Sequence, residues 1–482
     1  MTDQVRATPA QRWVLGLSAV ASFMVILDML VVATALSAIQ ADLGASLEEL
    51  EWTVNAYTLS FAVLLMTGAA LGDRYGRRRM FATGLAVFAL ASAVCALAPN
   101  VATLVAARAV QGAGAALIMP LALTLLNGAF PPERRGWATG IFGSVTGLAA
   151  MLGPVVGGLV TEGLSWPWIF WLNVPIAAIA VPLVLIRLPE SKGPGGRVDL
   201  PGLLLAGGSA LGLTWGLIRA NSVGWGSVET LVAFALGVVL AMGFVAWALR
   251  ARAPMLPLRL FRSRAFSAGN AVIFFVNGAM TGAIFFTAQL PQVALGDGPL
   301  LAGLRLLPWG IAPFLIAPRA GVLADRIGER PLILIGSALL TTGTAVLALV
   351  STLDAGYVVT VGPMVVAGVG FSLAIPAVTK AVVSSVGLQD IGRASGTFST
   401  LRQLGGAFGV AIPAAVFAAT GSYASPEAFV DGYRPAIGTA AALALAALLM
   451  GLPLPRKIRK TPPQTPDSVA EPTGSEVSSS PR

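Results

Sequence analysis

Residues 71–80 read Leu-Gly-Asp-Arg-Tyr-Gly-Arg-Arg-Arg-Met. This stretch lies between two apolar runs, 52–72 and 80–98, and it places four arginines and one aspartate within seven residues. So much charge is unstable in hydrocarbon, so the stretch must be a short loop at a membrane surface. The positive-inside rule assigns that surface to the cytoplasm.

A second charged turn repeats the first one about 250 residues later, in Gly321-Val-Leu-Ala-Asp325-Arg326-Ile-Gly328-Glu-Arg330. Other small residues repeat with a constant offset of 256 positions. Gly112, Gly114, Pro120, Gly136, Ala138 and Gly140 recur as Gly368, Gly370, Pro376, Gly392, Ala394 and Gly396. These repeats predict a duplicated membrane protein with two equivalent six-helix halves, an architecture that transporters use.

The composition excludes several classes of protein. Hydrophobic residues make up 56 % of the 482 and charged residues 11 %, which excludes an ordinary soluble globule. The chain has no histidine, and its single cysteine, Cys95, excludes an intrachain disulfide. The net charge of +9 resides almost entirely in short loops, so it reports membrane orientation and predicts no nucleic-acid partner.

Apolar runs of about 20 residues predict transmembrane helices. Fourteen such runs fall near 13–38, 52–72, 80–98, 101–127, 137–161, 168–186, 199–218, 229–249, 267–290, 301–320, 331–351, 356–379, 394–420 and 433–453. In this layout 26 of the 31 Lys and Arg residues fall on the cytoplasmic side, and only Arg219 and Arg434 fall in outer loops. The bias predicts that both termini are cytoplasmic.

The predicted fold is an all-α polytopic membrane protein in five parts. These are a cytoplasmic N-terminus (1–12), a first half of six helices (13–186), a linker with two inserted transmembrane helices (187–266), a second half of six helices (267–453) and a cytoplasmic tail (454–482). The tail is rich in Pro, Ser, Thr and Glu, which predicts disorder without a function of its own.

The first half carries groups that the second half lacks at the equivalent positions. Arg108 corresponds to Met364, and Pro154 corresponds to Val410. Asp28 has no acidic counterpart in the ninth span, and it is the only acid deep in a predicted span. Since the second half folds without these groups, we predict that they serve function.

Asp28 and Arg108 fall at similar depths. Asp28 lies about 15 residues into a helix that enters from the cytoplasm, or about 22 Å at 1.5 Å per residue. Arg108 lies about seven residues, or about 10 Å, into a helix that enters from outside a core of about 30 Å. An ionised aspartate there costs about 2.5–3.5 kcal/mol and requires a partner or a water-filled cavity. Two interpretations stay open: a fixed ion pair that joins two helices, or a proton-coupling site in which Arg108 tunes Asp28.

Three further groups of residues are candidates. The charged turns form a conformational latch or only enforce topology; their residues are Gly72, Asp73, Arg74, Gly76, Arg77, Arg78, Gly321, Asp325, Arg326, Gly328 and Arg330. The fifth span is predicted to pack closely and to kink at its proline, through Gly147, Gly153, Pro154, Gly157 and Gly158. The candidates for the lining of a substrate cavity are Gln111, Trp52, Tyr57, Arg402 and Gln403. Arg402 either reaches that cavity or extends toward the membrane surface.

These motifs resemble those of the major facilitator superfamily, specifically its fourteen-span drug:proton antiporters of the EmrB/QacA type, over about residues 10–453. Residues 71–78 resemble the loop motif between spans two and three, although its leading glycine is Ala69 here. Residues 104–112 resemble the fourth-span motif, whose arginine the family implicates in proton transfer. Residues 147–158 resemble the fifth-span motif that is typical of antiporters.

The first-span motif is only partly kept. Residues 27–36 resemble it and retain Asp28, but Leu30, Ala33 and Ser37 replace residues that are Thr, Asn and Pro in the family pattern. The resemblance therefore implies the transport class more strongly than it implies the substrate.

We predict a plasma-membrane protein that exports an amphipathic compound in exchange for protons. No Walker-type phosphate loop is present, so neither ATP nor another cofactor is expected, and no metal is expected. The alternatives are a dedicated exporter of one endogenous metabolite, antibiotic or lipid, and a proton-coupled nutrient symporter. An enzyme is disfavoured by the lack of histidine and of paired intramembrane carboxylates, and a membrane sensor by the lack of an output domain. A monomer is favoured.

Overall fold

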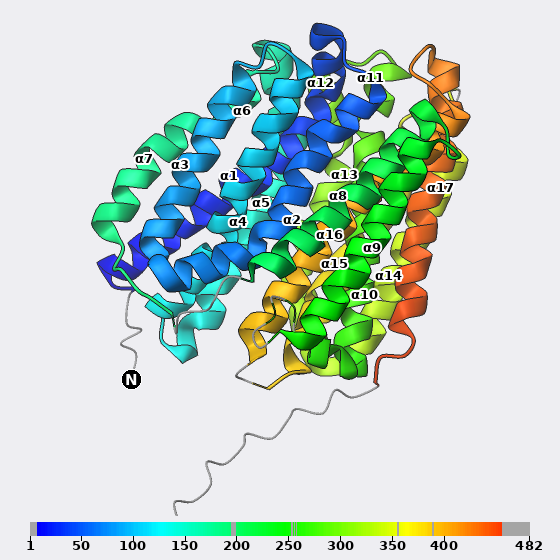
Figure 1. The fold of residues 1–482 in the computed structure, drawn as a ribbon. Helices are drawn as coiled ribbons and strands as arrows, with labels where there is room; N and C mark the ends of the chain where they lie inside the picture. The colour runs from blue at the N-terminus through cyan, green and yellow to red at the C-terminus, as the bar shows by residue number, and fades with distance from the viewer. Residues whose placement is uncertain are drawn as a thin grey trace, which may run out of the picture.

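The computed structural model describes residues 7–193, 199–251, 254, 256, 258–353, 356–387 and 390–455. These residues form helices and no strand. Long helices lie side by side in one bundle, and α1 (Pro9–Leu43) begins at the same end of the bundle at which α17 (Pro426–Gly451) ends (Figure 1). The prediction of an all-α polytopic protein is confirmed. Most of the predicted tail, from residue 456 onward, lies outside the described residues.

Six helices follow α1 in the first half. They are α2 (Leu47–Tyr75), α3 (Arg77–Ala96), α4 (Val101–Ala129), α5 (Pro132–Gly163), α6 (Trp168–Trp171) and α7 (Asn173–Arg187). The linker contains α8 (Leu200–Val223), α9 (Val228–Arg250) and a short 3₁₀ helix, η1 (Leu258–Arg262). The second half contains α10 (Arg264–Thr287), α11 (Leu290–Val293), α12 (Pro299–Arg305), α13 (Leu307–Ile327), α14 (Glu329–Val350), α15 (Val358–Ser384), α16 (Ile391–Thr420) and α17.

Thirteen helices within the described residues are long and apolar enough to cross a membrane. The predicted span 301–320 is not among these thirteen, and it contains a break, because α12 ends at Arg305 and α13 begins at Leu307. Pro308 has no amide hydrogen for a helical bond, and the amide of Trp309 donates to the carbonyl oxygen of Leu306, 3.1 Å away. The chain therefore turns where a continuous run of apolar residues predicted one straight helix.

Helix α2 begins five residues before the predicted start of its span. Ser46 and Glu49 form a capping box, in which the Glu49 amide donates to Ser46 Oγ (3.3 Å) and the Ser46 amide donates to Glu49 Oε2 (2.8 Å). The helix therefore includes Glu51, whose residue is only 3 % exposed. Asp28 is therefore not the only buried acid in a long helix, because the capping box starts α2 before the point at which hydropathy places the span. That Asp28 is the only acid deep in a predicted span stays a prediction.

Each half packs largely within itself. In the first half α2 and α3 lie against α4, α1 lies against α5, and α3 lies against α7. In the second half α14 lies against α15, α10 lies against α16 and α17, and α13 lies against α15. Between the halves, α2 packs on α16, and α5 packs on α12 and α13. The inserted α8 packs on α9 and also contacts α2 and α16. The domain boundaries stay a prediction.

The halves meet at the end of the bundle opposite the termini, which we call the closed end. There Gln292 Nε2 donates to the Thr34 carbonyl (3.2 Å), and the Leu300 amide donates to Glu162 Oε2 (2.9 Å). Toward the other end of α5, a Cβ added to Gly143 or Gly147 would meet no heavy atom within 4 Å. One face of α5 is therefore packed near the closed end and open near the termini.

Candidate functional site

Asp28 on α1 and Arg108 on α4 form a buried ion pair. Arg108 Nη1 lies 2.6 Å from Asp28 Oδ2, and the two side chains are 1 % and 0 % exposed. The similar depths of the two residues brought them within reach, and helix packing brought them into contact. Two such charges are stable in the interior only if the remaining donors and acceptors also find partners.

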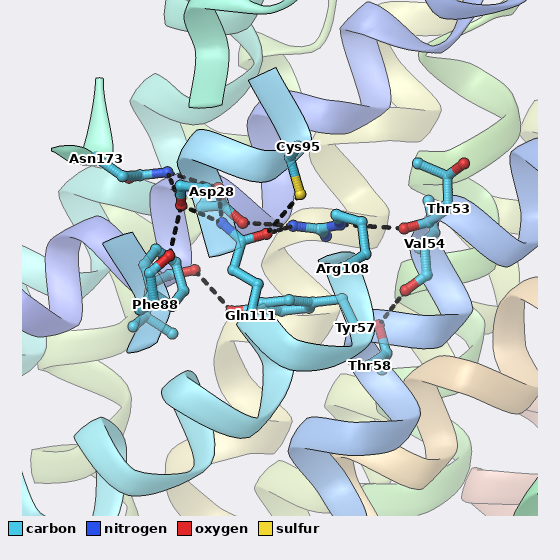
Figure 2. A network of polar contacts seen from close by, with 12 residues as sticks. Asp28, Thr53, Val54, Tyr57, Thr58, Phe88, Cys95, Arg108, Gln111 and Asn173 are labelled. Carbon is cyan, nitrogen blue, oxygen red and sulfur yellow. Dashed lines mark hydrogen bonds and ion pairs between the residues drawn. The ribbon is translucent and has the colours of Figure 1, made fainter. Parts of the chain in front are cut away.

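Two amides complete the shell of Asp28 (Figure 2). Gln111 Nε2 donates to Asp28 Oδ1 at 2.8 Å, and Asn173 Nδ2 donates to the same oxygen at 2.7 Å. Gln111 also donates to Ser92 Oγ (2.7 Å), which in turn donates to the Phe88 carbonyl (2.8 Å). Helices α1, α3, α4 and α7 thus converge on one carboxylate. We call Asp28, Ser92, Arg108, Gln111 and Asn173 the Asp28 network.

Arg108 is held by more than Asp28. Its Nε donates to the Thr53 carbonyl on α2 at 3.1 Å, and its Nη1 also donates to Gln111 Oε1 at 2.6 Å. The guanidinium carbon lies 4.2 Å from the centre of the Tyr57 ring, where a cation is attracted to the aromatic face. If Asp28 lost its charge, Arg108 would still have three other partners, Thr53, Gln111 and Tyr57.

The network can therefore exist in two charge states. A proton or a cationic ligand that takes Asp28 Oδ2 must displace Arg108 from that oxygen. The fork of the guanidinium allows such a change, because its donors point in several fixed directions. Asp28 is only 2 % exposed, so the structure must open before solvent reaches its carboxylate.

The first charged turn contacts the linker. Gly76 has a φ of 113°, which favours glycine, and it separates α2 from α3. Arg77, the first residue of α3, pairs with Asp73 near the end of α2 (2.8 Å). The amide of Gly193 donates to the Asp73 carbonyl (3.1 Å), and the amide of Arg77 donates to the Ser191 carbonyl (2.9 Å).

Glu190 anchors the arginines that follow. Its Oε1 accepts from the Arg78 amide at 3.0 Å, and its carboxylate lies 3.7 Å from both Arg78 and Arg79. Arg74 packs on the ring of its neighbour Tyr75 at 5.3 Å. In this conformation the first turn thus binds the end of α7 and the linker.

The second charged turn has the same backbone and different partners. Gly328 separates α13 from α14 with a φ of 90°. Glu329 pairs with Lys380 on α15 (3.0 Å), and Arg330 donates to the Leu452 carbonyl (3.1 Å). Arg326 is exposed, Gly321 lies on α13, and the side chain of Asp325 is outside the described residues.

The small residues of α5 allow two close contacts. A Cβ on Gly157 would lie 2.6 Å from the Val31 carbonyl oxygen of α1, and one on Gly153 would lie 2.7 Å from Leu30 Cβ. A Cβ on Gly158 would overlap the backbone of α12 at Pro299, while Gly147 faces open space. Pro154 lies inside the helix, and its carbonyl faces Gly303. This side of α5 joins α1 to the second half.

The five candidates for a cavity lining are dispersed. Gln111 and Tyr57 belong to the surroundings of Asp28, and the Trp52 ring contacts Trp215 of the inserted α8 (5.5 Å between centres). Arg402 is half-buried and Gln403 is 3 % exposed. Arg402 Nε and Gln403 Nε2 have no hydrogen-bond partner among the described residues. A pocket in the second half, lined by Thr287, Arg305 and Tyr357 among others, includes none of these candidates.

Sequence reasoning missed Asn173, Ser92, Glu190 and Glu51. Asn173 is a polar residue inside the apolar run 168–186, and that contrast was the available signal. Glu51 stands directly before the predicted span and required recognition of the capping box at Ser46. Glu190 lies among ordinary loop residues and offered no signal.

The comparisons with known proteins agree on one family. Residues 18–410 match the model of the Major Facilitator Superfamily. A cephamycin export protein of Amycolatopsis lactamdurans is 36 % identical over 470 residues, which cover 96 % of each chain. A tetracenomycin C resistance and export protein of Streptomyces glaucescens is 34 % identical over 431 residues, 89 % of this chain and 80 % of that protein.

Solved structures show the same fold at low identity. A bacterial homologue of the lysosomal transporter Spinster, in an inward-facing conformation, aligns with a TM-score of 0.66 at 16 % identity, covering 92 % of this chain and 97 % of that chain. A D-xylose-proton symporter aligns with a TM-score of 0.67 at 15 % identity, covering 93 % and 99 %. On the family match, the export relatives and the helical fold, this chain is a member of the Major Facilitator Superfamily.

Proposed function

We propose that this protein exports small amphipathic compounds across the plasma membrane in exchange for protons. Membership of a transporter superfamily and the export and resistance functions named for its relatives support export. The observation that carries proton coupling is the Asp28 network, a buried carboxylate in a half whose repeat has Met364 in place of Arg108.

Asp28 is the proton acceptor in this proposal. Loading of a proton on Asp28 Oδ2 releases Arg108, which keeps its contacts with Thr53, Gln111 and Tyr57. A cationic or bulky substrate that reaches the same carboxylate competes with that proton. Proton and substrate therefore occupy the site in turn, which is the requirement for exchange.

The proton gradient supplies enough free energy. A proton that moves inward gains about 2.3 kcal/mol per 100 mV of membrane potential. Each unit of pH difference adds about 1.36 kcal/mol. One or two protons therefore sustain a concentration ratio in the hundreds, without ATP or another cofactor.

The charged turns control the conformational exchange in this proposal. The first turn is held by Glu190, Ser191 and Gly193 while the halves are joined at the closed end. Separation of the halves at the closed end changes the spacing near the termini, where these contacts lie. We place both termini in the cytoplasm, in keeping with the distribution of Lys and Arg. We expect the protein to be a monomer.

A dedicated exporter of one compound is the second candidate. The cephamycin and tetracenomycin C exporters are relatives named for single compounds, whereas a relative in Mycobacterium tuberculosis, 35 % identical over 399 residues, is named for multidrug resistance. A nutrient symporter would move its substrate inward with protons, so the direction of coupling separates it from both.

The test is a substrate screen in everted membrane vesicles with an imposed inward-acid proton gradient. We expect an exported compound to release protons from the vesicle interior and to accumulate there. The control is Asp431→Asn, which changes an exposed aspartate on α17. Accumulation that is driven equally well without a proton gradient would contradict the proposal, and proton-coupled loss of the compound from the interior would indicate a symporter.

A further inference from the structure

Glu51 is a buried acid that the Asp28 network does not use. It lies one turn into α2, near the closed end, and the residue is 3 % exposed. Its Oε2 is buried and has no hydrogen-bond partner among the described residues. Asn55, one turn further along α2, likewise has an unpartnered Nδ2 and Oδ1.

The charged groups around Glu51 do not neutralise it. Glu48, on the same helix, interacts with it electrostatically and is paired with Arg219 of α8 (3.2 Å). Arg108 on α4 is bound to Asp28 of α1, and Arg402 on α16 has an unpartnered Nε and forms no ion pair among the described residues. The ion pairs within the described residues include none with Glu51.

The second half contributes the hydroxyl of Tyr423, in the loop between α16 and α17. Burial raises the pKa of the Tyr423 hydroxyl, and the Glu51 carboxylate raises it further. That hydroxyl donates to Gln289 Oε1 (2.5 Å), so the phenol stays protonated. Glu51 is therefore the group at this contact between the halves whose charge can change.

An ionised carboxylate that is buried without a cation or a donor is strongly unfavourable. A protonated one needs no ion partner. While the halves are joined at the closed end, Glu51 is enclosed between α2 and the second half. When they separate, water reaches the carboxylate and the ionised form is no longer penalised.

We propose that Glu51 is a second proton-binding site, which takes a proton from the solution at the closed end when the halves join and returns it when they part. The inference rests on the proposed function only in requiring that the halves separate. It assigns Glu51 no share in net proton movement, because the same side supplies and receives its proton. Under the proposed orientation, external pH then sets how readily the outer end opens.

The sign follows from linkage. The joined state binds one proton more than the separated state, so acid favours the joined state and alkali favours separation. A single group changes the ratio of the two states by at most about tenfold per pH unit. Asp28 differs, since its partners already satisfy the ionised form.

The experiment measures the distance across the closed end as pH varies. Spin labels are placed at Ala102→Cys, in the first turn of α4, and at Thr352→Cys, after α14; both positions are exposed, and the native Cys95 is buried. The purified full-length protein is studied in lipid nanodiscs without substrate, by pulsed electron paramagnetic resonance. Glu51→Gln, Glu51→Asp and the matched control Glu49→Gln are compared, each also in an Asp28→Asn background.

We expect alkali to convert short distances into long ones in the wild type and in Glu49→Gln, whose side chain still fits the capping box. Glu51→Gln should keep short distances at every pH, and Glu51→Asp should keep a pH response, in both backgrounds. An unaltered pH response in Glu51→Gln, or no response in the wild type, would overturn the inference. If Asp28→Asn alone removed the pH dependence of the label distance, the inference about Glu51 would fail while the proposed function stood. If the protein showed no proton-driven export, the pH dependence of the label distance could still be measured and would still test Glu51.

Discussion

Asp28 and Glu51 are both buried carboxylates of the first half, and they have opposite surroundings. Asp28 accepts from Arg108, Gln111 and Asn173, which come from two other helices. Glu51 has a buried oxygen without a partner among the described residues. The comparison shows that burial alone does not define the role of an acid, because one site is built for a charged carboxylate and the other for a neutral one.

The position of each acid in the bundle agrees with this difference. Asp28 lies inside the first half, where packing of α1, α3, α4 and α7 keeps its partners in place in every conformation in which that half stays intact. Glu51 lies where α2 faces the second half, so its surroundings change when the halves move. Several substitutions test this difference between the two acids.

The largest effect is expected for Asp28→Asn, which removes the proton acceptor and keeps its size. Gradient-driven export should fall to background. The protein should still fold, although Arg108 loses its counter-charge, because the amide oxygen accepts from Gln111 and Asn173 and Arg108 keeps its other partners. The measurement is accumulation in everted vesicles, with Asp431→Asn as the control. Undiminished active export by Asp28→Asn would end the assignment of Asp28 to proton coupling.

Arg108→Met, which copies position 364 of the repeat, should make Asp28 resemble Glu51. Removal of one partner of a buried pair costs about 3–5 kcal/mol, because the other charge is left uncompensated. Loss of the neighbouring cation favours the uncharged carboxyl, so the pH profile of export should shift in the alkaline direction.

Thermal unfolding in detergent and the pH profile of export measure the two effects of Arg108→Met. The double variant Asp28→Asn/Arg108→Met is the control, and it should be more stable than Arg108→Met alone. An unshifted pH profile would mean that Arg108 does not tune Asp28. Arg108→Lys should recover the charge and lose the fork.

Asn173→Ala should cost about 1–3 kcal/mol, since a buried donor to Asp28 Oδ1 is removed. Glu51→Gln removes no hydrogen bond of the buried Oε2 among the described residues, so it should cost less than Asn173→Ala. The measurement is the free energy of unfolding of each variant relative to the wild type, at the same acidic pH. Equal destabilisation by the two substitutions would show that Glu51 has a structural partner after all.

The smallest effect on stability is expected for Asp73→Ala. Asp73 is more exposed than Asp28 and Glu51, with 31 % of its side chain accessible. Loss of its pair with Arg77, four residues later, should cost about 0.3–0.5 kcal/mol. Turnover should slow with little change in substrate binding, measured by transport rate and by equilibrium binding. Weaker binding with unchanged turnover would argue against the latch.

Much of the fold was predictable because membrane helices are a local property. Runs of apolar residues located thirteen helices of sufficient length, and the charged turns located two helix junctions with glycines in the left-handed region, Gly76 and Gly328. Predictions erred at helix ends. The capping box at Ser46 starts α2 earlier than hydropathy predicted. A helix break just before Pro308 divides a span that was predicted to be continuous.

The amino-acid sequence by itself determined the membrane helices, the repeat and the depths of Asp28 and Arg108, because hydropathy, spacing and the rise of a helix depend only on neighbouring residues. Tertiary structure decided which side chains meet. The Asp28 carboxylate accepts from residues 83 and 145 positions away, the Trp52 ring contacts an inserted helix, and Glu51 is buried near Tyr423 of the second half. Such contacts depend on the rotation of each helix about its axis, which only packing against distant helices fixes.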